Sequence, residues 1–206
     1  EQKQPGTFRI VFLGDSCTLG QGVRDQDIYP NKVIVMARSL LEDRSIEVEG
    51  INLAVAGYNS YDAWVVWCLV GRSLNPDMLI LGYTLNDAEA PLYEFGPDWR
   101  TNGYIRRNRP LDHFEGAIDW DRGVHFSKVI SIFGKSLYIQ RLSRQTKNFY
   151  LDLYGPKNSE WLQKNLESLK ALSNDCMESS IPFLVLINPI FFGLDKEYPF
   201  LTFNVG

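Results

Sequence analysis

The 206 residues are enough for one α/β domain with a sizeable core, and the composition, 45% hydrophobic and 22% charged, is that of an ordinary globular protein. The formal net charge of −4 gives no sign of a basic face, which argues against nucleic acid as a partner. No stretch reaches the roughly 18 consecutive apolar residues of a transmembrane helix. The cysteines show no paired spacing, which argues against a disulfide framework or a zinc site.

The first half of the chain alternates short apolar runs with longer stretches of helical period. The pattern predicts strands over 9–13, 46–53 and 78–81 and helices over 28–41 and 61–72. The residues of the first helix that we expect on its buried face are Val33, Met36, Ala37, Leu40 and Leu41. Those of the second are Ala63, Val66, Trp67 and Val70, with Asn59, Ser60 or Asp62 as the cap. Cys17 and Cys68 stand in apolar surroundings and are expected to be small core residues.

The second half opens with an aromatic-rich segment, 91–126, that has no clear period. Such a segment is typical of a functional loop or lid, and an insertion that packs on its own small cluster is the equal alternative. Helices are predicted over 127–145 and 158–178 and a fully apolar strand over 183–187. The expected buried stripe of the later helix is Leu162, Leu166, Leu169, Leu172 and Cys176.

Alternating strands and helices, with each strand almost continuously apolar, predict a parallel sheet covered by helices on both faces. We therefore expect a single α/β domain over 1–206, with 91–126 as an insertion. In such folds, sites form beyond the carboxyl ends of the strands. Three polar turns stand at these ends, and they contain Ser16, Gly57 and Asn86.

These turns carry motifs in a fixed order. Gly14-Asp15-Ser16 follows the first strand, Gly57 follows the second, and Asn86-Asp87 follows the third. In order and spacing the chain resembles the GDSL/SGNH hydrolase family of esterases, lipases and acyl-modifying enzymes. The resemblance is sharp over residues 8–87 and implies a flavodoxin-like, three-layer α/β/α fold and an ester-cleaving serine enzyme.

The resemblance also implies a role for each turn. Ser16 would be the nucleophile. The backbone N–H groups of Ser16 and Gly57 and the side-chain amide of Asn86 would stabilise the oxyanion. We expect Asp15 and Asp87 to hold the turns through backbone hydrogen bonds rather than to take part in the chemistry. No cofactor and no metal are implied.

The sequence departs from the family pattern in two places. The family often has glycine two residues before the asparagine, whereas here Thr84 holds that position and Gly82 lies four residues before Asn86. The family's Asp-x-x-His, which would supply the base, is missing. The two histidines, His113 and His125, both come before the expected place. Together with the count of four strands where the family usually has five, this leads us to expect that a C-terminal part is absent from this chain and contains the base.

The leading functional hypothesis is a serine esterase that acts on a small acyl ester, with acetyl groups on a carbohydrate as one substrate class. An acyltransferase with the same acyl-enzyme and a non-catalytic binding module of the same fold are the alternatives. The expected partner is a small-molecule or carbohydrate ester. The sequence does not predict an oligomeric state. The compartment also stays open, since a leader or anchor removed before Glu1 would make the protein periplasmic or secreted.

Overall fold

The computed structural model describes residues 2–44, 46–90, 93–95, 105–107 and 150–188. In this part of the chain four strands form a parallel sheet in the order β2-β1-β3-β6. The strands are β1 (Thr7–Gly14), β2 (Glu47–Asn52), β3 (Met78–Tyr83) and β6 (Phe183–Ile187). The two further strands, β4 (Tyr93–Phe95) and β5 (Ile105–Arg107), pair with each other in antiparallel fashion.

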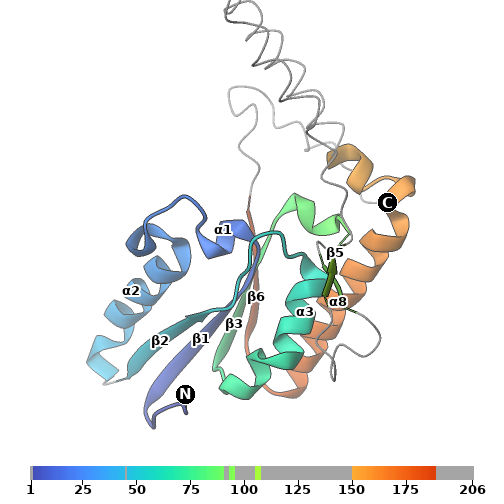
Figure 1. Ribbon diagram of the computed structural model, residues 1–206. Coiled ribbons are helices and arrows are strands. Elements are labelled where there is room, and N and C mark those ends of the chain that lie inside the picture. The colour runs from blue at the N-terminus through green and yellow to red at the C-terminus, as the bar shows by residue number, and fades with distance from the viewer. Residues whose placement is uncertain (1, 45, 91–92, 96–104, 108–149, 189–206) are drawn as a thin grey trace, which may run out of the picture.

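Helices cover the parallel sheet on both sides (Figure 1). The α-helices are α1 (Ser16–Leu19), α2 (Tyr29–Leu41), α3 (Ser60–Leu69) and α8 (Ser159–Glu178). Short 3-10 helices are η1 (Asp25–Asp27), η2 (Glu42–Arg44), η3 (Gly71–Leu74), η4 (Leu85–Ala88) and η6 (Pro156–Asn158). The predicted α/β class with a parallel sheet between helical layers is therefore confirmed.

The core consists of two apolar layers, one on each face of the sheet. Because successive side chains of a strand point to opposite faces, β1 contributes to both layers. Ile10 and Phe12 pack with Ile34 of α2. Val11 and Leu13 face the other way, into the layer that contains Trp67 of α3 and Leu172 and Cys176 of α8. Burial on both faces explains why the strands of this sheet read as continuous apolar runs.

The predicted strands and three of the four predicted helices match observed elements, with ends that differ by a few residues. The cap of α3 is Asn59, whose side chain accepts the backbone N–H of Asp62 at 3.0 Å. The helix predicted over 127–145 lies outside the described residues. Most of the segment 91–126 does as well, so its role as a loop, lid or insertion stays a prediction.

Several expectations about buried faces are wrong. Met36 and Leu40 of α2 are exposed, because the line of α2 that meets the sheet runs through Pro30 and Ile34 instead. Val70 is exposed because it lies at the C-cap, past the last turn of α3. Cys17 is exposed too, since α1 is a single turn at the edge of the sheet.

On α8 the expected buried stripe is correct in the C-terminal half of the helix and shifted by one residue in the N-terminal half. Leu172 and Cys176 are buried as predicted, but Leu166 is 41% exposed. Asn165 and Ser168 take the buried positions because their side chains bond to backbone carbonyl groups. Among the described helices, none has both the length and the apolar character needed to cross a bilayer.

Candidate functional site

The strand order places the turn of Ser16 between the other two turns. β1 lies between β2 and β3, and all three strands run in the same direction, so their carboxyl ends meet at one edge of the sheet. Ser16 follows β1, Gly57 follows β2, and Asn86 follows β3. The structure therefore brings the three predicted site residues to a common edge, the upper one in Figure 1.

The turn of Ser16 is fixed at both ends. Asp15 caps α1 with a side chain that accepts the backbone N–H of Cys17 at 2.9 Å. Gly20 closes the helix in a left-handed conformation, φ 82°, and donates its N–H to the carbonyl of Ser16 at 3.0 Å. Ser16 is thus the first residue of the helix rather than its cap, and its side chain is partly exposed.

Two glycines let α1 lie directly against the sheet. Gly14 and Gly82 are paired in register on β1 and β3. A Cβ atom on Gly14 would come within 2.2 Å of Thr18 Oγ1, and one on Gly82 within 2.1 Å of the same atom. The Tyr29 hydroxyl also donates a hydrogen bond to Thr18 Oγ1, at 3.0 Å. Gly82, whose position the family pattern does not explain, therefore has a packing role here.

The turn of Gly57 follows the end of β2 closely. The backbone N–H of Val55 donates to the carbonyl of Gly14 at 3.1 Å, which continues the pairing with β1 beyond the last strand residue. The backbone N–H of Tyr58 closes the turn by donating a hydrogen bond to the carbonyl of Val55, also at 3.1 Å. Gly57 has φ 82°, in the left-handed region that glycine tolerates without strain. α3 begins three residues later at Ser60.

The turn of Asn86 is the 3-10 helix η4. Thr84 is its N-cap and forms a reciprocal capping box with Asp87: the Asp87 carboxyl accepts the Thr84 N–H at 3.2 Å. Asn86 is partly exposed. Asp15 and Asp87 thus each hold a backbone amide of their own turn, as the sequence analysis expected.

Buried side chains also tie the three turns to one another. The Thr84 hydroxyl lies 2.7 Å from Asp15 Oδ2, which joins the turn of Asn86 to that of Ser16. Ser60 Oγ donates to Asp87 Oδ2 at 3.0 Å, which joins the start of α3 to the turn of Asn86. Each of these four residues is buried.

A second set of contacts holds the chain just after η4, through three asparagines. Asn59 Nδ2 donates to the carbonyl of Glu89 at 2.7 Å and Asn165 Nδ2 to the same carbonyl at 3.3 Å. Asn158 Nδ2 donates to the carbonyl of Ala88 at 2.6 Å. Asn165, which interrupts the stripe of α8, thus helps to anchor the chain after η4. Sequence reasoning missed this role, although an asparagine within an apolar stripe is a signal.

Burial changes the acidity of two groups at this edge. Burial and then the Asp15 carboxylate raise the pKa of Asp87 to about 7, against the lowering effect of hydrogen bonds from Thr84 and Ser60. The pKa of the Cys17 thiol is also raised, first by burial and then by Asp15 and Asp87. At neutral pH the thiol therefore keeps its proton.

The candidate nucleophile and amide are not engaged by the part of the chain that the structure describes. Neither Ser16 Oγ nor the Asn86 carboxamide forms a hydrogen bond to another described residue. His113 and His125 lie outside the described residues. Within the ranges given above, no three His, Cys, Asp or Glu side chains are grouped so as to hold a metal ion.

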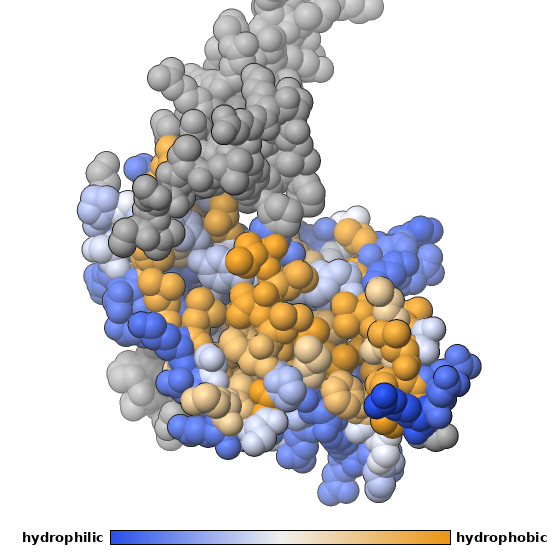
Figure 2. Space-filling view, turned by 180° about the vertical axis from the view of Figure 1, so that it is seen from behind, coloured by the Kyte–Doolittle hydropathy of each residue, from blue (hydrophilic) through white to orange (hydrophobic). Residues whose placement is uncertain are grey.

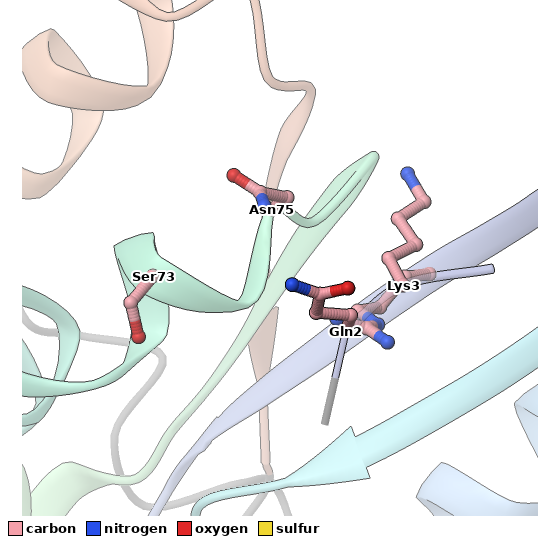
Figure 3. A pocket seen from close by; sticks show the side chains of 5 residues that line it. Gln2, Lys3, Ser73 and Asn75 are labelled. Atoms are coloured by element: carbon pink, nitrogen blue, oxygen red, sulfur yellow. The ribbon is translucent and has the colours of Figure 1, made fainter. Parts of the chain in front are cut away.

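A polar pocket lies at the opposite end of the sheet (Figure 3). It is lined by Gln2, Lys3, Arg9, Ser73 and Asn75. Its two cationic side chains already have acidic partners: Lys3 pairs with Asp77 and Arg9 with Glu49. The pocket lies near the amino ends of the strands, whereas Ser16 lies at their carboxyl ends, so the two sites are distinct.

No family model matches this chain, and no curated protein matches its sequence. Among solved structures, the chain is similar to AlinE4, an SGNH-hydrolase family esterase, with 24% sequence identity and a TM-score of 0.34. The match covers 42% of this chain and 44% of AlinE4. It thus spans less than half the length of that esterase. TesA matches with 10% identity, 85% and 76% coverage and a TM-score of 0.33. A mutant of Axe2, an acetylxylan esterase from Geobacillus stearothermophilus, matches with 12% identity, 85% and 74% coverage and a TM-score of 0.35.

Proposed function

We propose that this protein is a serine hydrolase that cleaves an ester through an acyl-enzyme on Ser16. The observation that carries the proposal is the placement of Ser16: the residue is partly exposed, it lies at the carboxyl end of a central strand, and its hydroxyl is not bonded to any described residue. Its turn is nevertheless held rigidly by Asp15 and by the close packing of Thr18. A nucleophilic hydroxyl needs this combination of access and fixed position.

In the proposed reaction Ser16 Oγ attacks the acyl carbon and gives up its proton to a general base. The carbonyl electrons move onto oxygen, and their return expels the alcohol, which takes up a proton. Water then attacks the acyl-serine ester, releases the acid and restores the hydroxyl. The described residues include no histidine to act as the base, since both histidines of the sequence lie outside them.

The proposed oxyanion donors are the N–H groups of Ser16 and Gly57 and the amide of Asn86. Three observations support this set. The first N–H groups of a helix have no partner within it, and Ser16 begins α1. Gly57 has a left-handed backbone at the neighbouring strand end. The Asn86 amide makes no bond to another described residue and is neutral, so it remains a donor at low cost in burial.

The neighbouring Cys17 is the obvious competitor for the role of nucleophile, because its thiol is exposed. The thiolate is the reactive form of cysteine, and the raised pKa of Cys17 keeps the thiol protonated at neutral pH. Burial and the Asp15 carboxylate, the two largest causes of the raised pKa, disfavour a negative charge on this thiol. We therefore assign the nucleophile to Ser16.

Hydrolysis of p-nitrophenyl acetate tests this assignment. Ser16→Ala should lower kcat/KM to the background rate, while Cys17→Ala, the matched neighbour, should stay within about threefold of the unchanged protein because the thiol is not charged. Circular dichroism of both variants controls for folding. Equal rates with and without Ser16, or a loss confined to Cys17→Ala, would contradict the proposal, and a folded but inactive unchanged protein would favour a binding module.

The proposed substrate class is a short acyl ester, with acetylated carbohydrate as the leading candidate. The support is the aromatic residues of the segment 91–126, because aromatic rings stack on sugar faces. Release of acetate from an acetylated polysaccharide, compared with transfer of acetyl to an added acceptor sugar, separates the hydrolase from the acyltransferase.

A further inference from the structure

The Thr84 hydroxyl lies between two buried carboxyl groups. Thr84 Oγ1 is 2.7 Å from Asp15 Oδ2 and 3.0 Å from Asp87 Oδ1. All three side chains are almost completely removed from solvent. A hydroxyl has a single hydrogen to donate, so it can donate fully to only one of the two carboxyl oxygens.

If both carboxyl groups were ionised, one of these two oxygen pairs would have no hydrogen between its atoms. Two acceptors would then face each other across 3.0 Å or less, away from water, which is costly. A proton on one carboxyl group removes the conflict. That group donates to Thr84 Oγ1, and Thr84 donates in turn to the other group.

The shorter contact at Asp15 and the raised pKa of Asp87 together assign the proton to Asp87. The 2.7 Å contact at Asp15 is as short as a bond from a hydroxyl to an ionised carboxylate, and Asp15 also accepts the Cys17 N–H at 2.9 Å. Asp87 has longer contacts, 3.0 Å to Thr84 Oγ1, 3.2 Å to the Thr84 N–H and 3.0 Å to Ser60 Oγ. These contacts are longer than the bonds that hydroxyl groups form to ionised carboxylates.

We propose that Asp87 keeps its proton at pH 6 and donates a hydrogen bond to Thr84, which donates in turn to Asp15, so that one proton locks the turn of Ser16 to the turn of Asn86. Thr84 is then a positioning residue, since it acts on these turns through their aspartates. The inference concerns the two turns and holds whether or not Ser16 is a nucleophile.

The described residues around Asp87 supply no positive charge. The titratable groups that act on it or that it acts on are Asp15, Cys17, Tyr83 and Tyr154. α3 contributes the uncharged Ser60. Among the described residues neither Asp15 nor Asp87 forms an ion pair with lysine or arginine. Burial and the Asp15 charge accordingly raise the pKa of Asp87 to about 7.

Infrared spectroscopy of the unchanged protein at pH 6 tests the proton directly. We expect the carbonyl band of a protonated, buried carboxyl group, absent in Asp87→Asn and retained in Thr84→Ser, which keeps a hydroxyl at the same place. Asp15→Asn should weaken the band, because it removes the negative charge that helps to raise the pKa of Asp87. No such band at pH 6, or its survival in Asp87→Asn, would overturn the proposal.

Unfolding equilibria give an independent test with a defined sign. The folded-state pKa of Asp87 is raised above its ordinary value of 3.8, so its contribution to stability is complete below about pH 4 and is lost as pH rises toward 7. Relative to Asp87→Asn, the unfolding constant of the unchanged protein should rise by up to about tenfold per pH unit in this window and level off above it. If the ratio of the unfolding constants of the unchanged protein and Asp87→Asn stayed constant from pH 4 to pH 8, Asp87 would not retain a proton in the folded state.

The bridge itself is tested by removing only the hydroxyl. Thr84→Val should raise the unfolding constant at pH 6 by about tenfold or more, because it leaves two buried carboxyl groups facing each other without a shared donor. Thr84→Ser should remain within about threefold of the unchanged protein. Equal unfolding constants of Thr84→Val and Thr84→Ser would show that the hydroxyl joins nothing.

Discussion

At the scale of the residue, the candidate site depends on how little space lies behind Ser16. Thr18 Oγ1 occupies the volume that a side chain at Gly82 or Gly14 would need. The turn that presents Ser16 can therefore rest on the end of the sheet only where β1 and β3 both offer glycine. This contact explains the position of Gly82, which the family pattern does not.

The same contact leads to a stability prediction. Gly82→Ala should destabilise the protein by about 1–3 kcal/mol, because its Cβ would overlap Thr18 Oγ1 and approach Tyr29 Oη to 2.7 Å. Gly155→Ala is the control, since a Cβ there meets nothing closer than 3.4 Å. Urea unfolding measures both. Equal urea midpoints for the two variants would mean that α1 can move to accommodate the added Cβ atom without loss of stability.

Sequence spacing located Ser16, Gly57 and Asn86 at the strand ends, because a turn after a strand can be recognised from local residues alone. It did not reveal the side chains that connect these turns. Thr84 meets Asp15 across 69 positions and Ser60 meets Asp87 across 27, so nothing local marks either pair. Threonine and serine are also common in turns, which hides any special role.

At the scale of the element, strands were easier to predict than the buried faces of helices. An apolar run that is buried on both sides marks a strand without ambiguity in this fold. On α2, apolar residues occupy two adjacent lines, and the pattern alone does not say which line meets the sheet. On α8, the polar Asn165 is buried because it bonds to the loop after η4, a tertiary contact that no periodicity contains.

The corrected face of α8 gives a matched pair of variants. Leu172→Ala should cost about 2–5 kcal/mol, because Leu172 is completely buried in the layer between α8 and the sheet. Leu166→Ala, six residues earlier on the same helix, should cost less than about 1 kcal/mol because Leu166 is 41% exposed and lies outside the buried layer. Chemical denaturation of both variants measures the difference. Similar losses would restore the originally expected stripe.

At the scale of the whole molecule, the strand order is what gathers the site. The sequence predicted a parallel sheet but could not supply the order β2-β1-β3-β6, which depends on how each connection crosses the sheet. With β1 in the middle, the turns after β2 and β3 flank Ser16. A different order would separate the three motifs although each turn stayed the same.

One face of the sheet is only partly covered by the described residues. Figure 2 shows hydrophobic side chains gathered on the side seen from behind. Leu184 and Leu186 of β6 share this face with Ile80, which packs in the layer that contains Ile34 of α2. Even so, Leu184 is 48% exposed. The covered part of the sheet, over β1 and β3, is the part that supports the turn of Ser16.

The measurement that tests the central claim most directly is covalent labelling by a fluorophosphonate probe, which reacts with activated serine hydroxyls, followed by intact mass and peptide mapping. The account predicts one adduct per chain, located on Ser16, absent in Ser16→Ala and preserved in Cys17→Ala. No adduct on the folded protein, or an adduct at another residue, would contradict the assignment of Ser16 as the nucleophile.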